Sequence, residues 1–187
     1  MTTLPLLIRH EDISDREAIE RLHERAFGPG RFARTAFRLR EGAGERPDLC
    51  FTAHVSTYLV GSVRLSPIRI GSAPGLVLGP IAVEPEFKSR GIGQALIEAA
   101  LEAARQAGDR FVILVGDEPY YQRSGFTKVP QGRLAMPGPV DPDRLLWLAL
   151  APDAFEGVSG AVIPAEAGER GVRSPISDGP RETEVPW

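Results

Sequence analysis

The sequence predicts a mixed α/β domain built on one main sheet. Two segments, Leu76 to Val83 and Phe111 to Val115, are apolar almost throughout, as expected of strands buried on both faces. Between them, residues 91–107 repeat small and apolar residues at helical spacing. The full order is a strand, two helices, three strands, a helix, a strand, a short helix and one or two strands. That order indicates helices packed on a single mixed sheet.

The N-terminal third predicts one strand and two helices. Leu6 to Arg9 has the character of a short strand, and Ser14 or Asp15 offers a helix N-cap. The next segment, "DREAIERLHERAF", places its apolar residues on one helical face, and Gly28-Pro29 ends it. A second helix is expected over residues 31–40.

The remaining segments supply the sheet. Two alternating stretches, "LCFTAHVS" and "YLVGSVRLSPIRI", predict a hairpin that turns around Thr57 to Gly61. After the strand at 111–115, "PYYQRSGF" predicts a short helix, with further strands at 126–129 and in "RLLWLAL". We expect one domain over 1–150, an extension that packs on it over 151–164, and a loosely ordered tail over 165–187, where proline, glycine and acidic residues accumulate.

Composition excludes several classes of protein. The formal net charge of −3 gives no global basic field for nucleic acid. One cysteine, Cys50, rules out an internal disulfide framework and favours a reducing compartment. No basic segment precedes the first apolar run, and no run approaches the roughly 20 residues of a membrane span. We therefore expect a cytoplasmic protein without nucleic-acid or membrane partners, and leave a homodimer open.

The stretch "EPEFKSRGIGQALIEAA" is typical of an anion-binding turn at the start of a helix. Gly91 and Gly93 carry no side chains, so a large anion can approach backbone N–H groups that have no intrahelical partner. Lys88 and Arg90 add positive charge at the same place. A P-loop would need Lys-Ser or Lys-Thr after the second glycine, and the dinucleotide fingerprint would need glycine where Leu96 stands. A simple tight turn is the alternative.

The same residues resemble the GNAT superfamily of acyl-CoA-dependent N-acyltransferases. "KSRGIGQAL" is similar to the family signature Q/R-x-x-G-x-G/A, and the likeness runs over the element order from about residue 6 to 150. It implies a GNAT-like fold whose turn binds the pyrophosphate of coenzyme A through backbone amides. Lys88 stands where the family usually has Gln or Arg. By position the amides belong to Lys88, Ser89, Arg90, Gly91, Ile92, Gly93 and Gln94.

The strand before this turn contains a proline, Pro80, which has no N–H to donate to a ladder. Either this is a kinked edge strand or a bulge interrupts its pairing. The resemblance favours a bulge, because in the family this strand splays from the next and the pantetheine arm lies in the gap. Backbone groups of Ile81, Ala82 and Val83 would then hold the arm, and an N–H near Val83 would polarise the thioester carbonyl.

Acyl transfer to an amine needs a base for the attacking ammonium and a proton donor for the leaving thiolate. Tyr121 stands four residues before Gly125, as in the family pattern Y-x-x-x-G-F, and the resemblance implies that it is the general acid. Glu84 ends the splayed strand and is a candidate base; a surface carboxylate is the alternative. We expect Tyr120 to face the core or the acceptor pocket. Asp117 stands where many relatives have an asparagine that contacts pantetheine.

No metal site is expected, because the three histidines lack ligand spacing and His23 is expected on a surface or interface. The resemblance implies an N-acetyltransferase that moves an acetyl group from acetyl-CoA to a primary amine by direct attack in a ternary complex. A non-catalytic acyl-CoA-binding or sensing module and an interaction protein with an inert pocket are the alternatives. A small-molecule or peptide amine acceptor is expected to contact the two N-terminal helices, the loop 41–48 and the segment after Gly125.

Overall fold

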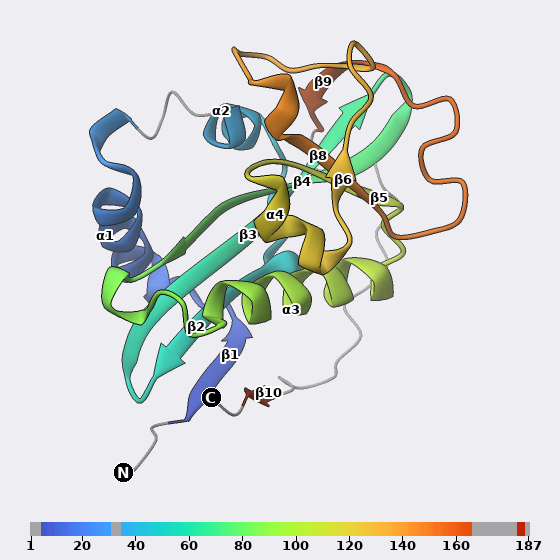
Figure 1. Ribbon diagram of the computed structural model, residues 1–187. Helices are drawn as coiled ribbons and strands as arrows, with labels where there is room; N and C mark the ends of the chain where they lie inside the picture. The colour runs from blue at the N-terminus through green and yellow to red at the C-terminus, as the bar shows by residue number, and fades with distance from the viewer. Residues whose placement is uncertain (1–4, 31–34, 166–182, 186–187) are drawn as a thin grey trace.

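The structure is a computed structural model that describes residues 5–30, 35–165 and 183–185 (Figure 1). One large mixed sheet forms its centre, in the strand order β10-β1-β2-β3-β4-β5-β8-β6, with β9 added to β3 and β7 to β9. The pairs β4–β5 and β7–β9 are parallel, and the other pairs are antiparallel. The predicted fold class, a mixed sheet flanked by helices, is confirmed.

The strands are β1 (Leu6–His10), β2 (Cys50–Val55), β3 (Tyr58–Ile70), β4 (Ala73–Val83), β5 (Phe111–Val115), β6 (Thr127–Lys128), β7 (Leu134–Ala135), β8 (Leu145–Ala149), β9 (Gly160–Pro164) and β10 (Thr183–Val185). The helices are α1 (Arg16–Phe27), α2 (Thr35–Glu41), α3 (Ile92–Gln106) and α4 (Glu118–Tyr121). No helix among these is both long and apolar enough to cross a membrane.

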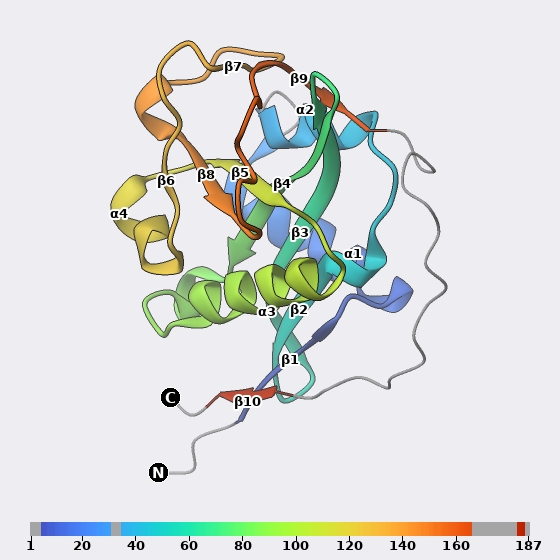
Figure 2. The same cartoon turned by 90° about the vertical axis from the view of Figure 1, so that its right-hand side faces the viewer.

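Helices cover both faces of the sheet (Figures 1 and 2). α3 lies on one face, where its buried residues, including Ile92, Leu96 and Leu101, join alternate residues of β1 to β4 in the main core. Two smaller clusters lie outside this core. In one, Ile19 and Leu22 of α1 pack with side chains of β3 and β4; in the other, Leu39 of α2 packs with side chains of β3, β4, β5 and β8. These apolar stripes at helical spacing fix each helix to its face of the sheet.

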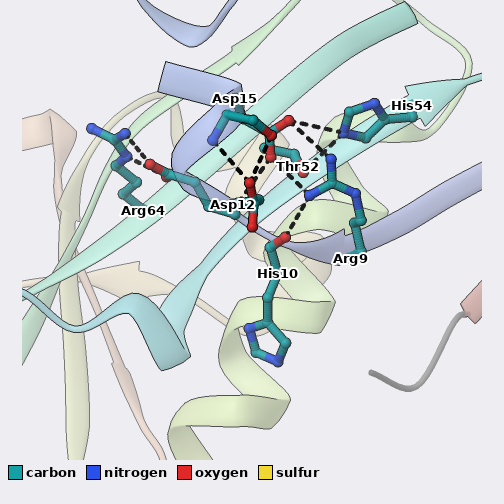
Figure 3. Close-up of polar contacts among 9 residues, drawn as sticks. Arg9, His10, Asp12, Asp15, Thr52, His54 and Arg64 are labelled. Carbon is teal, nitrogen blue, oxygen red and sulfur yellow. Dashed lines mark hydrogen bonds and ion pairs between the residues drawn. The ribbon is translucent and has the colours of Figure 1, made fainter. Parts of the chain in front are cut away.

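The start of α1 is tied to β1 and β2 by a buried polar network (Figure 3). Arg9 donates two hydrogen bonds to the Asp15 carboxylate, at 2.8 and 2.9 Å. His54 lies 3.1 Å from Thr52 Oγ1 and 3.9 Å from Asp15. Asp15, one of the two predicted positions, is the N-cap residue of α1, but its side chain forms no capping hydrogen bond to the helix. Asp12 caps the short 3-10 turn before α1 with its side chain.

β4 and β5 pair over a short distance and then separate. Only Leu76 with Val112 and Val77 with Ile113 are in register. On the other side of β4 the pairing with β3 continues to Val83 but shifts by one residue, so that Arg64 of β3 lies opposite both Gly79 and Pro80. The bulge predicted from Pro80 is therefore present, and the β5-facing edge of β4 beyond Leu78 has no strand partner in the described chain.

Other expectations needed smaller corrections. The hairpin turn is at Ser56 and Thr57, while Gly61 lies inside β3. The strand expected over 126–129 is limited to β6. Residues 160–164, within the segment expected to pack on the domain, pair with β3 as β9. The predicted helix residues 31–34 and most of the predicted tail lie outside the described residues; within the tail, 183–185 pair with β1.

Candidate functional site

The turn before α3 presents backbone N–H groups at a helix N-terminus. Ser89 and Gly91 have left-handed backbone conformations, with φ of 62° and 78°. α3 begins at Ile92, and the N–H of Ala95 is the first to bond back into the helix, at 3.0 Å from the Gly91 carbonyl. The N–H groups of residues 92–94 precede that bond and point out of the helix end. Such a concave turn binds anions, which is what the sequence predicts here.

Positive side chains flank this turn. Lys88 and Arg90 are exposed, and neither forms an ion pair with another described residue. The Arg90 guanidinium lies 5.4 Å from the centre of the Phe87 ring, within cation–π distance. Both charges are therefore available to a phosphate bound at the amides.

Tyr120 closes over the first turn of α3. A Cβ built on Gly93 would collide with the Tyr120 hydroxyl, while the nearest ring atom would be 3.6 Å away. Gly93 is thus needed for this close approach, besides its freedom at a helix start. Gln94 beside it donates a hydrogen bond to Ser124 Oγ, which ties α3 to the segment after α4. Tyr120 was expected to face the core or the acceptor pocket; the residue is 40% exposed, and its hydroxyl lies against the first turn of α3 instead.

The predicted pantetheine residues lie along the open edge of β4. Val83, Ala82 and Ile81 pair with β3 on one side, through Gly61, Ser62 and Val63. The other side faces the gap left by β5. Extended backbone with an unpaired edge can accept an additional strand-like ligand, in the same way that an edge strand accepts a peptide. The edge lies between the turn at residues 88–94 and the bulge at Pro80.

Tyr121 is held at the end of β5 by close packing. Its ring lies against Gly116, where any Cβ would collide with it, and meets Tyr120 and Phe126 edge-on at centroid distances of 4.9 and 6.0 Å. Burial raises the pKa of Tyr121 to about 12, with nearby Tyr120 and Asp117 adding to the effect. The phenol therefore keeps its proton at neutral pH, as a general acid must.

Glu84 is placed differently from a free surface carboxylate. Its side chain is 2% exposed, and it accepts hydrogen bonds from Nε and Nη2 of Arg25 on α1. Its backbone N–H bonds the Val60 carbonyl at 2.8 Å. The pair joins α1 to the end of β4, which indicates a structural function. That Glu84 is the base stays a prediction.

Several residues that the sequence singled out lie elsewhere. Asp117 is exposed and pairs with Arg144 at 3.1 Å. His23 is fully buried beside Ser62, 3.1 Å from its hydroxyl, so the surface position expected for it is wrong. In the described part of the chain no group of His, Cys, Asp and Glu is placed to hold a metal ion.

Sequence reasoning missed three contributors: Tyr120 over Gly93, Gly116 under Tyr121, and Arg25 on Glu84. Gly116 carried a readable signal, because a glycine directly after a buried strand often marks close packing. The contacts of Tyr120 with Gly93 and of Arg25 with Glu84 join segments that are far apart in the chain, so no local sequence pattern predicts them.

Comparison with known proteins agrees with this geometry. Residues 16–126 match the model of the Acetyltransferase (GNAT) family. YjhQ of Escherichia coli K12, an uncharacterized N-acetyltransferase, is 32% identical over 119 residues, which cover 62% of this chain and 66% of YjhQ. YhbS of the same strain, also an uncharacterized N-acetyltransferase, is 28% identical over 159 residues, or 84% of this chain and 95% of YhbS.

Two solved structures share the fold. The crystal structure of E. coli YhbS in complex with CoA matches with a TM-score of 0.75 at 26% identity, covering 88% of this chain and 92% of that one. A GNAT acetyltransferase from Brucella melitensis in complex with acetyl-CoA matches with a TM-score of 0.60 at 28% identity, covering 80% and 91%. Since the family model spans more than half of the chain, this protein belongs to the GNAT acetyltransferase family.

Proposed function

We propose that the protein is an acetyl-CoA-dependent N-acetyltransferase that acts on a primary amine. The observation that carries the proposal is the separation of β4 from β5 beyond Val77, with the anion-binding turn of α3 at the end of the same strand. One site binds a diphosphate, and the open strand edge beside it binds an extended arm. Relatives with the same fold are solved with CoA and acetyl-CoA, which supports the same donor here.

The residues of the turn fit this donor. Amides of residues 88–94 and the charges of Lys88 and Arg90 would hold the pyrophosphate, and the free edge of Ile81 to Val83 would hold the pantetheine. Acetyl-CoA would supply an acetyl group activated as a thioester. The N–H near Val83 would stabilise negative charge on the carbonyl oxygen.

Side chains of the protein then donate and accept the protons of the reaction. The amine attacks directly: a C–N bond forms, the C–S bond breaks, and the phenol of Tyr121 donates its proton to the sulfur. Glu84, or water, takes the proton of the ammonium. Cys50 is a poor nucleophile for a covalent intermediate, because burial raises the pKa of its thiol to about 11. A ternary complex is therefore the mechanism we infer.

The test measures thiol release from acetyl-CoA against a panel of primary amines. Tyr121→Phe should lower kcat by about 10²- to 10⁴-fold, the usual contribution of a positioned acid, while calorimetry shows CoA binding nearly unchanged. Tyr58→Phe, which removes a hydroxyl from the exposed hairpin, is the matched control. If the parent protein binds CoA but turns over no amine, and Tyr121→Phe behaves as the parent does in both measurements, the result would instead indicate a sensing module.

A further inference from the structure

A further basic side chain, that of Arg123, lies near the start of α3 and has no part in the site described above. It belongs to the short 3-10 turn at residues 122–124, which follows α4. The side chain is exposed and forms no ion pair or hydrogen bond with another described residue. Its charge is therefore available to a ligand.

Two observations place Arg123 beside the first turn of α3. The next residue, Ser124, accepts a hydrogen bond from the Gln94 side chain, so the 3-10 turn packs on the start of that helix. Burial raises the pKa of Tyr120, and the charge of Arg123 opposes that rise, so the guanidinium acts on the Tyr120 hydroxyl. That hydroxyl lies against Gly93. Arg123 is thus within electrostatic reach of the N–H groups at the start of α3.

Arg123 approaches the start of α3 from a different element than Lys88 and Arg90 do. Those two residues lie in the turn that joins β4 to α3. Arg123 comes from the segment after β5, and Figures 1 and 2 show α4 and the chain that follows it against α3. An anion held at the turn by Lys88 and Arg90 leaves Arg123 free to bind a second anionic group beside it.

The proposed donor carries two separate anionic groups on its nucleotide. The diphosphate is attached to the 5′ carbon of the ribose, and a phosphate monoester is attached to the 3′ carbon of the same ring. A ligand whose diphosphate lies at the amides of α3 therefore has its monoester only a few bonds away. A phosphate monoester carries a charge of about −1.5 to −2 at neutral pH. A guanidinium binds such a group through charge-assisted, often bidentate, hydrogen bonds.

We propose that Arg123 binds the 3′-phosphate of the acyl-CoA donor and makes the protein select CoA over dephospho-CoA, which has the same diphosphate and pantetheine arm. This inference rests on the proposed acetyltransferase function, and it assigns a specificity residue to the donor site. The basic residues then have separate roles, since Lys88 and Arg90 bind the diphosphate that both ligands share. Because Arg123 is exposed, its contribution is modest and is screened by salt.

The experiment measures the binding of CoA and of dephospho-CoA to the full chain by calorimetry. We expect the parent protein to bind CoA about tenfold more tightly, as for one charge-assisted contact at the surface. Arg123→Ala should remove most of this preference by weakening CoA, and should change the affinity for dephospho-CoA by less than about twofold. Arg123→Lys should keep part of the preference, because it retains the charge without the guanidinium fork. Added salt should reduce the preference of the parent protein.

Arg105→Ala is the matched control, because Arg105 is an exposed arginine at the opposite end of α3 and its loss changes the net charge equally. Turnover gives a second readout. Arg123→Ala should raise KM for acetyl-CoA and leave kcat unchanged, since the 3′-phosphate is at the far end of the donor from the thioester.

Three results overturn the inference and leave the acetyltransferase in place. They are equal affinity of the parent protein for CoA and dephospho-CoA, an equal loss for both ligands in Arg123→Ala, and a preference for CoA that survives Arg123→Ala. A preference that depends on Arg123, without turnover of any amine, keeps the 3′-phosphate site and overturns the acetyltransferase. Binding of neither ligand to the parent protein overturns both.

Discussion

Gly93 and Tyr120 lie in close contact at the turn before α3. The tyrosine hydroxyl occupies the space that a side chain at position 93 would need, so two residues that are 27 positions apart are coupled by sterics alone. Tyr120 is partly exposed, and partial burial raises the pKa of its hydroxyl, which therefore stays neutral beside the backbone N–H groups at the start of α3. Substitutions at either residue test whether this steric contact is needed for ligand binding at the turn.

Gly93→Ala should weaken CoA binding by about tenfold, because the new methyl displaces Tyr120 and crowds the amides. The double variant Gly93→Ala/Tyr120→Phe should recover most of the loss, since the nearest remaining ring atom would be 3.6 Å from the methyl. Calorimetry with CoA measures both. A double variant as weak as the single one would place the defect in the backbone and not in Tyr120.

At the scale of elements, the helices are attached to the sheet by polar contacts as well as by apolar stripes. Arg25 near the end of α1 holds Glu84 at the end of β4, and Asp15 at the start of α1 is bound to Arg9 of β1. Both contacts pair a buried carboxylate with an arginine that stays partly in water. The two ends of α1 are thus fixed independently, one next to the proposed pantetheine edge.

Arg25→Ala should lower the free energy of unfolding by about 1–3 kcal/mol, because it leaves a buried carboxylate without its donor. Arg25→Ala combined with Glu84→Gln should recover part of that loss, since the neutral amide is cheaper to bury alone. Urea unfolding of the three variants measures the effect. If Arg25→Ala unfolds at the same urea concentration as the parent, the ion pair contributes nothing to the attachment of α1.

His54 should make the stability of this region depend on pH. Burial, helped by the charge of Arg9 and opposed by Asp15, lowers the pKa of His54 in the folded protein below its ordinary 6.5. The unfolded chain then binds more protons than the folded one between those two pKa values. The free energy of unfolding should fall as pH falls from about 6.5 through the folded pKa.

Thermal unfolding at pH 7.5 and pH 5.0 tests this dependence. His54→Gln, which cannot be protonated, should show a smaller fall in melting temperature over that interval than the parent protein. His10→Gln is the control, because His10 is exposed on the neighbouring strand. An equal fall in the parent and in His54→Gln would assign the pH dependence to other groups.

At the scale of the whole molecule, we expect ligand binding to change backbone protection mainly at the gap between β4 and β5. β4 belongs to the central sheet, yet its edge beyond Leu78 has no partner among the described strands. Backbone groups at such an edge are hydrated until something covers them. A bound pantetheine arm would complete the sheet at that point.

Saturating CoA should therefore slow amide hydrogen exchange at residues 78–83, and raise the melting temperature by the linkage expected of a ligand that binds only the folded state. Exchange in β2, which is paired on both sides along its length, should change little. A rise in melting temperature without added protection in 78–83 would place CoA elsewhere on the molecule.

Local sequence was enough to predict the turn before α3 and most elements of the sheet. Glycines at 91 and 93, the helical spacing after them and the apolar strand before them all depend on neighbours within a few residues. The missing N–H of Pro80 predicted either a kinked edge strand or a bulge, and only the family resemblance favoured the bulge that is present. β9 and β10 were not predicted as strands, since their partners β3 and β1 are distant in the chain.

The sequence by itself determined the family resemblance, the glycine-containing turn before α3 and the candidate acid Tyr121, since each is a pattern of residues close together in the chain. Only the tertiary structure decided that Arg25 forms an ion pair with Glu84 and that Tyr120 covers Gly93. These pairings join residues separated by whole elements. Their geometry follows from how helices pack on the sheet, which is a property of the entire core and of no single segment.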